Sequence, residues 1–188
     1  MNAYGPSFFE IVPNKLAIRK ATIPGGDWHK RFTVNIDLKL NENTFDKKAN
    51  IFGVTDVSTY PIIGALPAVF LQPNSKLLEV CFYLNGANQC KKLDNEVPVN
   101  EWFNLKIQQK CDPIFPAGLD CKFSVKVGDV VEWVEQNTKP SEFINVNGII
   151  GNTYSQDDII AASGYYSHFE LDTSEDGTNL VFFDAENI

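Results

Sequence analysis

Three acidic residues near the C-terminus have a spacing that could support glycoside hydrolysis. They are Glu170, Asp172 and Glu175 in the stretch ELDTSE. Two carboxyl groups about 5 Å apart can act on one sugar as nucleophile and general acid/base. The stretch DTSEDGTN, however, has the composition of a solvated loop. We therefore interpret the triplet as an acidic surface turn, and a hydrolase that uses Glu170 and Glu175 is the alternative.

Oxygen-bearing side chains in two predicted loops indicate calcium as a cofactor. Carboxylate and carbonyl oxygens at a loop rim suit a hard cation. Neither stretch has the spacing of an EF-hand, and solvated acidic loops without a metal are the alternative. The candidate ligands, from GNTYSQDD and DTSEDG, are Asn152, Asp157, Asp158, Asp172 and Asp176.

Two tyrosines are candidates for ligand binding, because an exposed ring beside polar groups can stack on a sugar face. Tyr60 lies in the Pro/Gly-rich segment 57–67, and Tyr154 lies in the second half of the chain. The two histidines, His29 and His168, have no neighbouring Ser or Cys nucleophile pattern, so we expect them to be structural or surface residues. No Gly-rich phosphate loop is present. Catalysis is not expected.

The four cysteines predict two disulfides. In EVCFYLNGANQC, Asn85-Gly86 is a strong signal for a two-residue hairpin turn. The register of that hairpin places Cys81 opposite Cys90 in a non-hydrogen-bonded pair, close enough for a disulfide. Cys111 and Cys121 likewise close a loop between two alternating strands. Four buried free thiols are the alternative, but the pairing 81–90 with 111–121 favours an oxidising, extracellular compartment.

Composition and charge limit the possible partners. The 188 residues carry 16 basic and 24 acidic side chains, a net charge of −8. This acidity argues against nucleic acid and anionic membranes. No apolar run approaches the ~18 residues of a membrane span, so membrane insertion is not expected. The N-terminus lacks the pattern of a signal peptide, so we expect either a cytosolic protein or a mature secreted form. The cysteines favour secretion.

Alternating polarity predicts short strands along almost the whole chain. The predicted strands and hairpins are RFTVNIDLKL, NIFGVT, PAVFLQ, LEVCFYLNGANQC, CKFSVKVGDVVEWVEQ, SEFINVNGIIGN, SGYYSHFELD and LVFF. Gly128-Asp129 is expected to form a two-residue turn. The only helical signal is a single turn from Ser155 to Gly164. One domain of about a dozen antiparallel strands is predicted.

The strand opened by Trp102 carries a family resemblance. In NEWFNLKIQ, Phe103, Leu105 and Ile107 share one face, while Asn104, Lys106 and Gln108 share the other. This strand, with a hairpin before it and the hairpin KFSVKVGDVVEWV after it, resembles the strand that begins with Glu-Trp in laminin-G and concanavalin A-like jelly rolls. INVNGIIGNTYS and AASGYYSHFEL are similar to the end of such domains. The likeness is one of pattern, over about residues 28–171.

The resemblance implies an all-β fold, an antiparallel β-sandwich of the concanavalin A-like/laminin-G-like jelly-roll type. Residues 1–188 would form one domain, with a core at about 28–171 and terminal extensions. The superfamily includes glucanases with the spacing Glu-x-Asp-x-x-Glu, matched by Glu170, Asp172 and Glu175. However, Thr173 and Ser174 stand where apolar residues are expected, and the motif lies near the C-terminus rather than mid-chain.

The sequence thus predicts a non-enzymatic, extracellular recognition module. Its expected partners are a glycan or a matrix or cell-surface protein, bound by loops while the sheets act as scaffold. Self-association is a further expectation. The alternatives are the glucanase-like hydrolase and a structural subunit of an extracellular coat or matrix.

Overall fold

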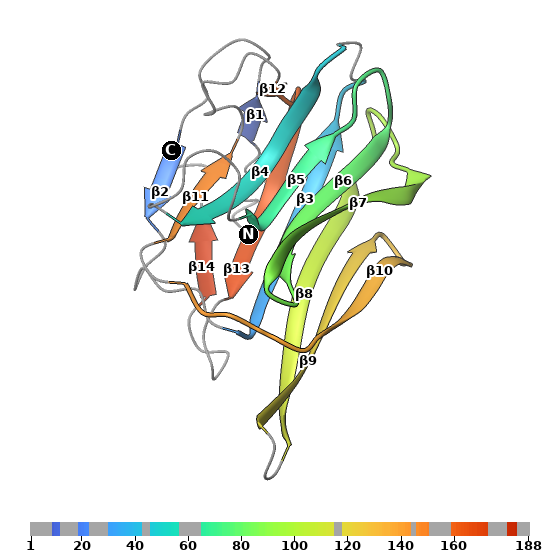
Figure 1. Ribbon diagram of the computed structural model, residues 1–188. Helices are drawn as coiled ribbons and strands as arrows, with labels where there is room; N and C mark the ends of the chain where they lie inside the picture. The colour runs from blue at the N-terminus through green and yellow to red at the C-terminus, as the bar shows by residue number, and fades with distance from the viewer. Residues whose placement is uncertain are drawn as a thin grey trace, which may run out of the picture.

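A computed structural model describes residues 9–11, 19–22, 30–42, 46–56, 65–114, 118–143, 146–150, 159–172 and 180–183. These residues form fourteen strands in two seven-stranded sheets and, within those ranges, no helix. None of the described segments is therefore a helix long and apolar enough to span a membrane. The two sheets pack face to face as a sandwich (Figure 1), so the predicted all-β fold is confirmed.

The first sheet, called sheet A, contains the strand that Trp102 precedes. Its strands pair in the order β1, β13, β3, β8, β9, β10, and β14 also pairs with β13. Their bounds are β1 (Phe9–Ile11), β13 (Gly164–Asp172), β3 (Phe32–Leu40), β8 (Phe103–Ile114), β9 (Gly118–Val127), β10 (Val130–Asn137) and β14 (Leu180–Phe183). All pairings in sheet A are antiparallel.

The second sheet, called sheet B, contains the Asn85-Gly86 hairpin. Its strands pair in the order β2, β11, β4, β5, β6, β7, and β12 pairs with β4 in parallel. Their bounds are β2 (Arg19–Thr22), β11 (Val146–Ile150), β4 (Lys48–Asp56), β5 (Ala65–Leu71), β6 (Leu77–Leu84), β7 (Ala87–Glu96) and β12 (Ile159–Ala161). Strands β1, β2 and β14, from the expected terminal extensions, thus belong to the two sheets.

The core between the sheets follows from period-two alternation. On β3 every second residue is buried, and Phe103, Leu105 and Ile107 of β8 lie in the core as predicted. Aromatic rings join the two sheets: Phe82 of β6 stacks on Phe123 of β9, with centroids 4.7 Å apart. Each core aromatic removes a large apolar area from water, so this stack is a main source of cohesion between the layers.

The hairpin register and both disulfides agree with the sequence prediction. Asn85 and Gly86 adopt positive φ angles of 54° and 85°, and Cys81 pairs with Cys90 in the β6–β7 ladder. Disulfides join Cys81 to Cys90 and Cys111 to Cys121. The second disulfide crosses the β8–β9 hairpin, which extends beyond the rest of the two sheets (Figure 1).

The predicted helical turn at residues 155–164 is wrong where the structure describes it. Residues 159–161 form β12, and Gly164 begins β13. Gly164 lies so close to β3 that a Cβ atom there would be 2.6 Å from the Lys39 carbonyl oxygen. Glycine is therefore needed for strand packing and does not end a helix. Pairing with distant strands outweighs the weak local capping signal, because a short isolated helix is only marginally stable.

Candidate functional site

Most residues predicted to bind a ligand or metal lie outside the described part of the chain. This applies to Tyr60, Tyr154, Asn152, Asp157, Asp158, Glu175 and Asp176. The two described members, Glu170 and Asp172, lie on β13, paired with β3 and β14, and are partly buried. The predicted acidic surface turn is therefore wrong for these two residues. The calcium site and the Glu170/Glu175 pair therefore remain predictions.

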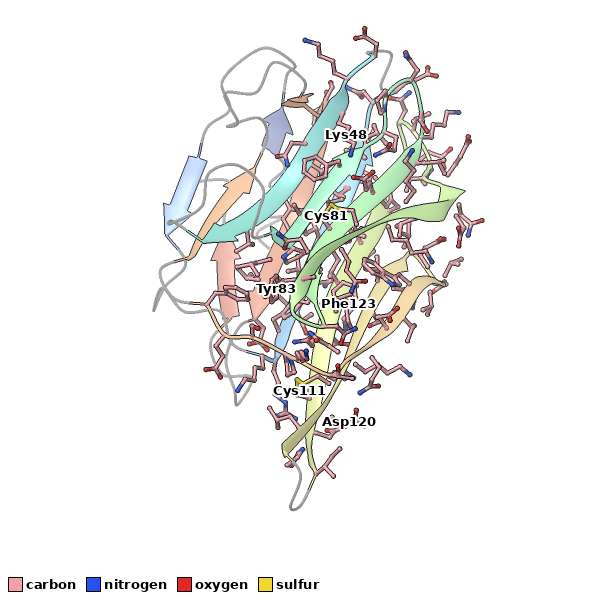
Figure 2. The ribbon with its side chains drawn as sticks, viewed as in Figure 1. Lys48, Cys81, Tyr83, Cys111, Asp120 and Phe123 are labelled. Carbon is pink, nitrogen blue, oxygen red and sulfur yellow. A yellow bond between two sulfur atoms is a disulfide. The ribbon has the colours of Figure 1, made fainter. Side chains whose placement is uncertain are left out.

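The described residues contain one cluster with metal-ligand side chains, formed by Glu79, Cys81 and Cys90. The two sulfurs are joined in a disulfide, so no thiolate is available to a metal. The carboxylate of Glu79 accepts hydrogen bonds from Lys48 and Gln72. Figure 2 labels Lys48 and Cys81 on this part of sheet B. A buried carboxylate with such partners has a structural explanation.

The outer face of the three neighbouring strands β3, β8 and β9 of sheet A is polar. On β3 and β8 buried residues alternate with half-exposed ones, so every second side chain points away from the core. Pairing of β3, β8 and β9 brings these outward residues into rows. They are Thr33, Asn35, Asp37 and Lys39 of β3, Asn104, Lys106, Gln108 and Lys110 of β8, and Lys122, Ser124 and Lys126 of β9.

A hollow of about 400 Å³ opens at one end of this face. Its lining comes from three neighbouring strands: Asp37 on β3, Ser167 on β13, and the start of β8 with Trp102, Phe103 and Asn104. Trp102 is 47% exposed although tryptophan is usually well buried. A large exposed ring beside polar groups is a common feature of ligand sites.

The chain that leads into β8 fixes the position of Trp102. Asn100 adopts a left-handed conformation, with φ 60°, which turns the chain from sheet B toward sheet A. Its backbone N–H donates to the Leu40 carbonyl at 2.8 Å, and the Val97 N–H donates to Lys76 at 2.9 Å. Asparagine tolerates this conformation better than most residues. Trp102 is thus tied to the end of β3 and to sheet B.

A hydrogen-bond network holds the polar wall of the hollow. The Asn104 amide nitrogen donates to Asn35 Oδ1 and to Asp37 Oδ1, both at 2.9 Å. The Asn35 amide in turn donates to Glu170 Oε2 at 3.3 Å. Because both hydrogens of the Asn104 amide are engaged, its orientation is fixed and its carbonyl oxygen has a defined direction.

Several polar atoms of the hollow have no partner within the described ranges. No hydrogen bond there engages the indole N–H of Trp102, the hydroxyl of Ser167 or the second carboxylate oxygen of Asp37. The hollow therefore offers donors and acceptors next to an apolar ring. This combination suits a ligand that has an apolar face and a rim of hydroxyl groups.

Sequence reasoning missed this site, although a signal was present. The alternation that places Asn104, Lys106 and Gln108 on the outer face also places Trp102 there, one step earlier in the strand. The sequence pattern alone indicates only that Trp102 begins a scaffold strand. The partners Asp37 and Ser167 could not be found from local pattern, because β3 and β13 are far from β8 in sequence.

Comparison with protein-family models and with curated proteins gave no match. Solved structures with a similar fold include the LG4–5 domains of the mouse laminin α1 chain, with 11% identity and a TM-score of 0.58. That match covers 88% of this chain and 44% of the laminin chain. A candidate carbohydrate-binding protein from Bacteroides ovatus has 16% identity and a TM-score of 0.56, over 85% of this chain and 42% of that one.

A third similar structure is an enzyme, the endo-β-1,4-glucuronan lyase of the fungus Trichoderma reesei. It has 12% identity and a TM-score of 0.54, and the match covers 89% of this chain and 79% of the lyase. These likenesses show the fold: the chain is a concanavalin A-like jelly-roll sandwich, as the sequence resemblance implied. At such identities they establish no activity for this chain.

Proposed function

We propose that this protein is an extracellular, non-enzymatic glycan-binding domain whose binding site is the Trp102 hollow on sheet A. The observation that carries the proposal is the exposed Trp102 ring beside the fixed Asn104 amide and the Asp37 carboxylate. One face of a sugar ring is lined by C–H groups and can pack on the indole. Its hydroxyl groups can bond to Asp37, Ser167 and the indole N–H.

An extracellular location is supported by the two disulfides, because cytosolic thiols are normally kept reduced. Similar structures named for laminin and for carbohydrate binding support a recognition role. The hollow is formed by strands and by the chain leading into β8, so the proposal places binding on the sheet face.

A glycan array followed by titration calorimetry tests the proposal. We expect the wild-type protein to bind at least one glycan, and Trp102→Ala to weaken that binding about thirtyfold, the size typical of an aromatic hot spot. Trp102→Phe should retain part of the affinity. Leu119→Ala, which removes an exposed apolar side chain of the β8–β9 hairpin, is the control and should bind like wild type.

A silent array, or equal binding by wild type and Trp102→Ala, would contradict the proposal. The hydrolase alternative has a separate test, because it requires turnover. Incubation with β-glucans and with glucuronan should release no new reducing ends or unsaturated products. Turnover that disappears in Glu170→Gln, with the fold retained, would instead establish the enzyme.

A further inference from the structure

Two pairs of lysines lie directly opposite each other on the outer face of sheet A. The β8–β9 register pairs Lys106 with Lys126 and Lys110 with Lys122. Residues opposite each other in an antiparallel pair have Cβ atoms about 5 Å apart, and like charges at this distance destabilise a sheet. A protein with a net charge of −8 has nevertheless concentrated four cations on one hairpin. Natural proteins break one or two such local rules at their functional sites.

Nearby acidic groups leave the Lys106/Lys126 pair only weakly compensated. Asp37 of β3 is the diagonal neighbour of Lys106 across the β3–β8 ladder, but within the described residues Lys106 forms no ion pair. Lys126 contacts the fully exposed Asp129 at 3.5 Å. Solvent screens such an exposed contact strongly. The Lys110/Lys122 pair differs, because the next outward pair along the hairpin is Asp112 opposite Asp120. Lys106/Lys126 is therefore the stronger candidate for an external anion.

The position of this pair relative to the Trp102 hollow indicates what kind of anion it fits. Asn104, in the wall of the hollow, and Lys106 are consecutive outward residues of β8, so their Cα atoms are about 7 Å apart. The long side chain of Lys106 can therefore reach the unit of an extended ligand that follows the one in the hollow. The hollow itself contains the carboxylate of Asp37, which disfavours a second negative charge there. An extended ligand should thus be neutral at the hollow and acidic at the next unit.

We propose that the glycan bound at the Trp102 hollow is an acidic polysaccharide in which neutral and acidic sugars alternate, with the acidic group held by Lys106 and Lys126. This inference rests on the proposed function and specifies its ligand class. Binding of one carboxylate or sulfate between the two ammonium groups would also relieve their mutual repulsion. A uniformly neutral glycan would lack this contribution.

The probe is hyaluronan, in which uronic acid and neutral amino sugar alternate, together with its methyl ester as a neutral control on the same backbone. We expect wild type to bind hyaluronan about tenfold more tightly than the ester, as two solvent-screened charge contacts would give. Lys106→Gln/Lys126→Gln should reduce hyaluronan binding to the level of the ester and leave ester binding unchanged. Higher salt should weaken only the wild-type preference.

Matched variants separate this effect from net charge. Lys76→Gln/Lys92→Gln removes two charges from the sheet B side and should leave the preference intact. The Lys106/Lys126 variant should melt at the same or a higher temperature, since a like-charge pair is removed, so loss of binding would not reflect unfolding.

Three results would overturn the inference of an acidic ligand without deciding whether the protein binds glycans. Equal wild-type affinity for hyaluronan and its ester would exclude an acidic preference, although glycan binding would stand. An equal loss of hyaluronan binding in Lys106→Gln/Lys126→Gln and in Lys76→Gln/Lys92→Gln would show that the net charge of the protein determines the preference. Binding of a DNA oligonucleotide or polyphosphate as tight as that of hyaluronan would show a general anion surface. If no glycan binds at all, the proposed function itself fails.

Discussion

The amide nitrogen of Asn104 on β8 donates a hydrogen bond to the Asp37 carboxylate on β3 at 2.9 Å. The two residues are opposite each other in the ladder that joins β3 and β8. This bond, with the one to Asn35, sets the direction of the polar groups that face Trp102. A candidate site held in this way is organised without a ligand, and such preorganisation limits the entropy lost on binding.

Replacing Asn104 by Ala should weaken glycan binding about tenfold, since one fixed acceptor and the orientation of Asp37 are lost. Stability should change by less than about 1 kcal/mol, because the side chain is partly exposed and water can replace its bonds. Calorimetric titration and chemical unfolding give the two quantities. Gln89→Ala, which removes an amide from sheet B, is the control. If Asn104→Ala bound the glycan as tightly as wild type, the hydrogen bonds of Asn104 would have no part in ligand binding.

Tyr166 joins the two sheets through the core. Its hydroxyl donates to the backbone carbonyl of Ile51 on β4 at 3.1 Å. We expect Tyr166→Phe to lower the free energy of unfolding by about 1–2 kcal/mol, because the buried carbonyl loses a partner. Urea unfolding at neutral pH measures this difference. No loss would mean that the carbonyl is satisfied without the hydroxyl.

Burial also raises the pKa of the Tyr166 hydroxyl above its ordinary value. Because the folded state holds this proton more tightly than the unfolded state, the stabilisation is fully present below the ordinary tyrosine pKa of about 10 and decreases above it. Wild type should therefore lose stability more steeply than Tyr166→Phe as the pH rises past about 10. If both proteins lost the same free energy of unfolding across that pH range, the raised pKa of Tyr166 would be contradicted.

Glu132 of β10 connects this strand to β7, and the two strands stand last in the described strand order of their sheets. The residue is 7% exposed, and its carboxylate accepts hydrogen bonds from the Asp94 backbone N–H and the Asn95 amide of β7. Glu132→Ala should cost about 1–3 kcal/mol, because these donors lose a charged acceptor. Hydrogen exchange should also increase along β7 and β10. Glu135→Ala, at a half-buried position of the same strand, should have a smaller effect on both measurements.

The two disulfides should be found as 81–90 and 111–121 in peptide maps of the unreduced protein. Replacing Cys81 and Cys90 together by Ala should lower the unfolding free energy by about 2–3 kcal/mol in the chain-closure description. The β-sheet circular dichroism should persist, because the core aromatic stack lies outside the bridge. A spectrum of random coil would show that the core cannot support the fold alone.

The predicted calcium site can be examined by thermal melting. If the side-chain oxygens of Asn152, Asp157, Asp158, Asp172 and Asp176 bind Ca²⁺ in the folded state alone, added Ca²⁺ should raise the melting temperature in proportion to occupancy. Chelator should reverse the shift, and Mg²⁺ should reproduce it poorly because it demands a stricter geometry. Identical melting curves with Ca²⁺ and with chelator would contradict the predicted calcium site.

Several features of the fold were determined by the sequence itself, because their causes are local. Side-chain alternation set the inward face of β3 and of β8 through a period of two. The Asn85-Gly86 turn set the register of β6 and β7 and with it the pairing of Cys81 and Cys90. The Cys111–Cys121 pairing also determines that Lys106 lies opposite Lys126, because one register fixes every residue pair in this hairpin.

The position of the candidate site was decided by the tertiary structure. Asp37, Trp102 and Ser167 meet because β3 lies between β8 and β13, and no local pattern states which strands become neighbours. The same holds for β12, which pairs in parallel with β4 although its sequence carried a helix-capping signal. Strand neighbours are selected by the burial and backbone pairing of the whole chain at once, so side chains distant in sequence come together only when the sandwich is complete.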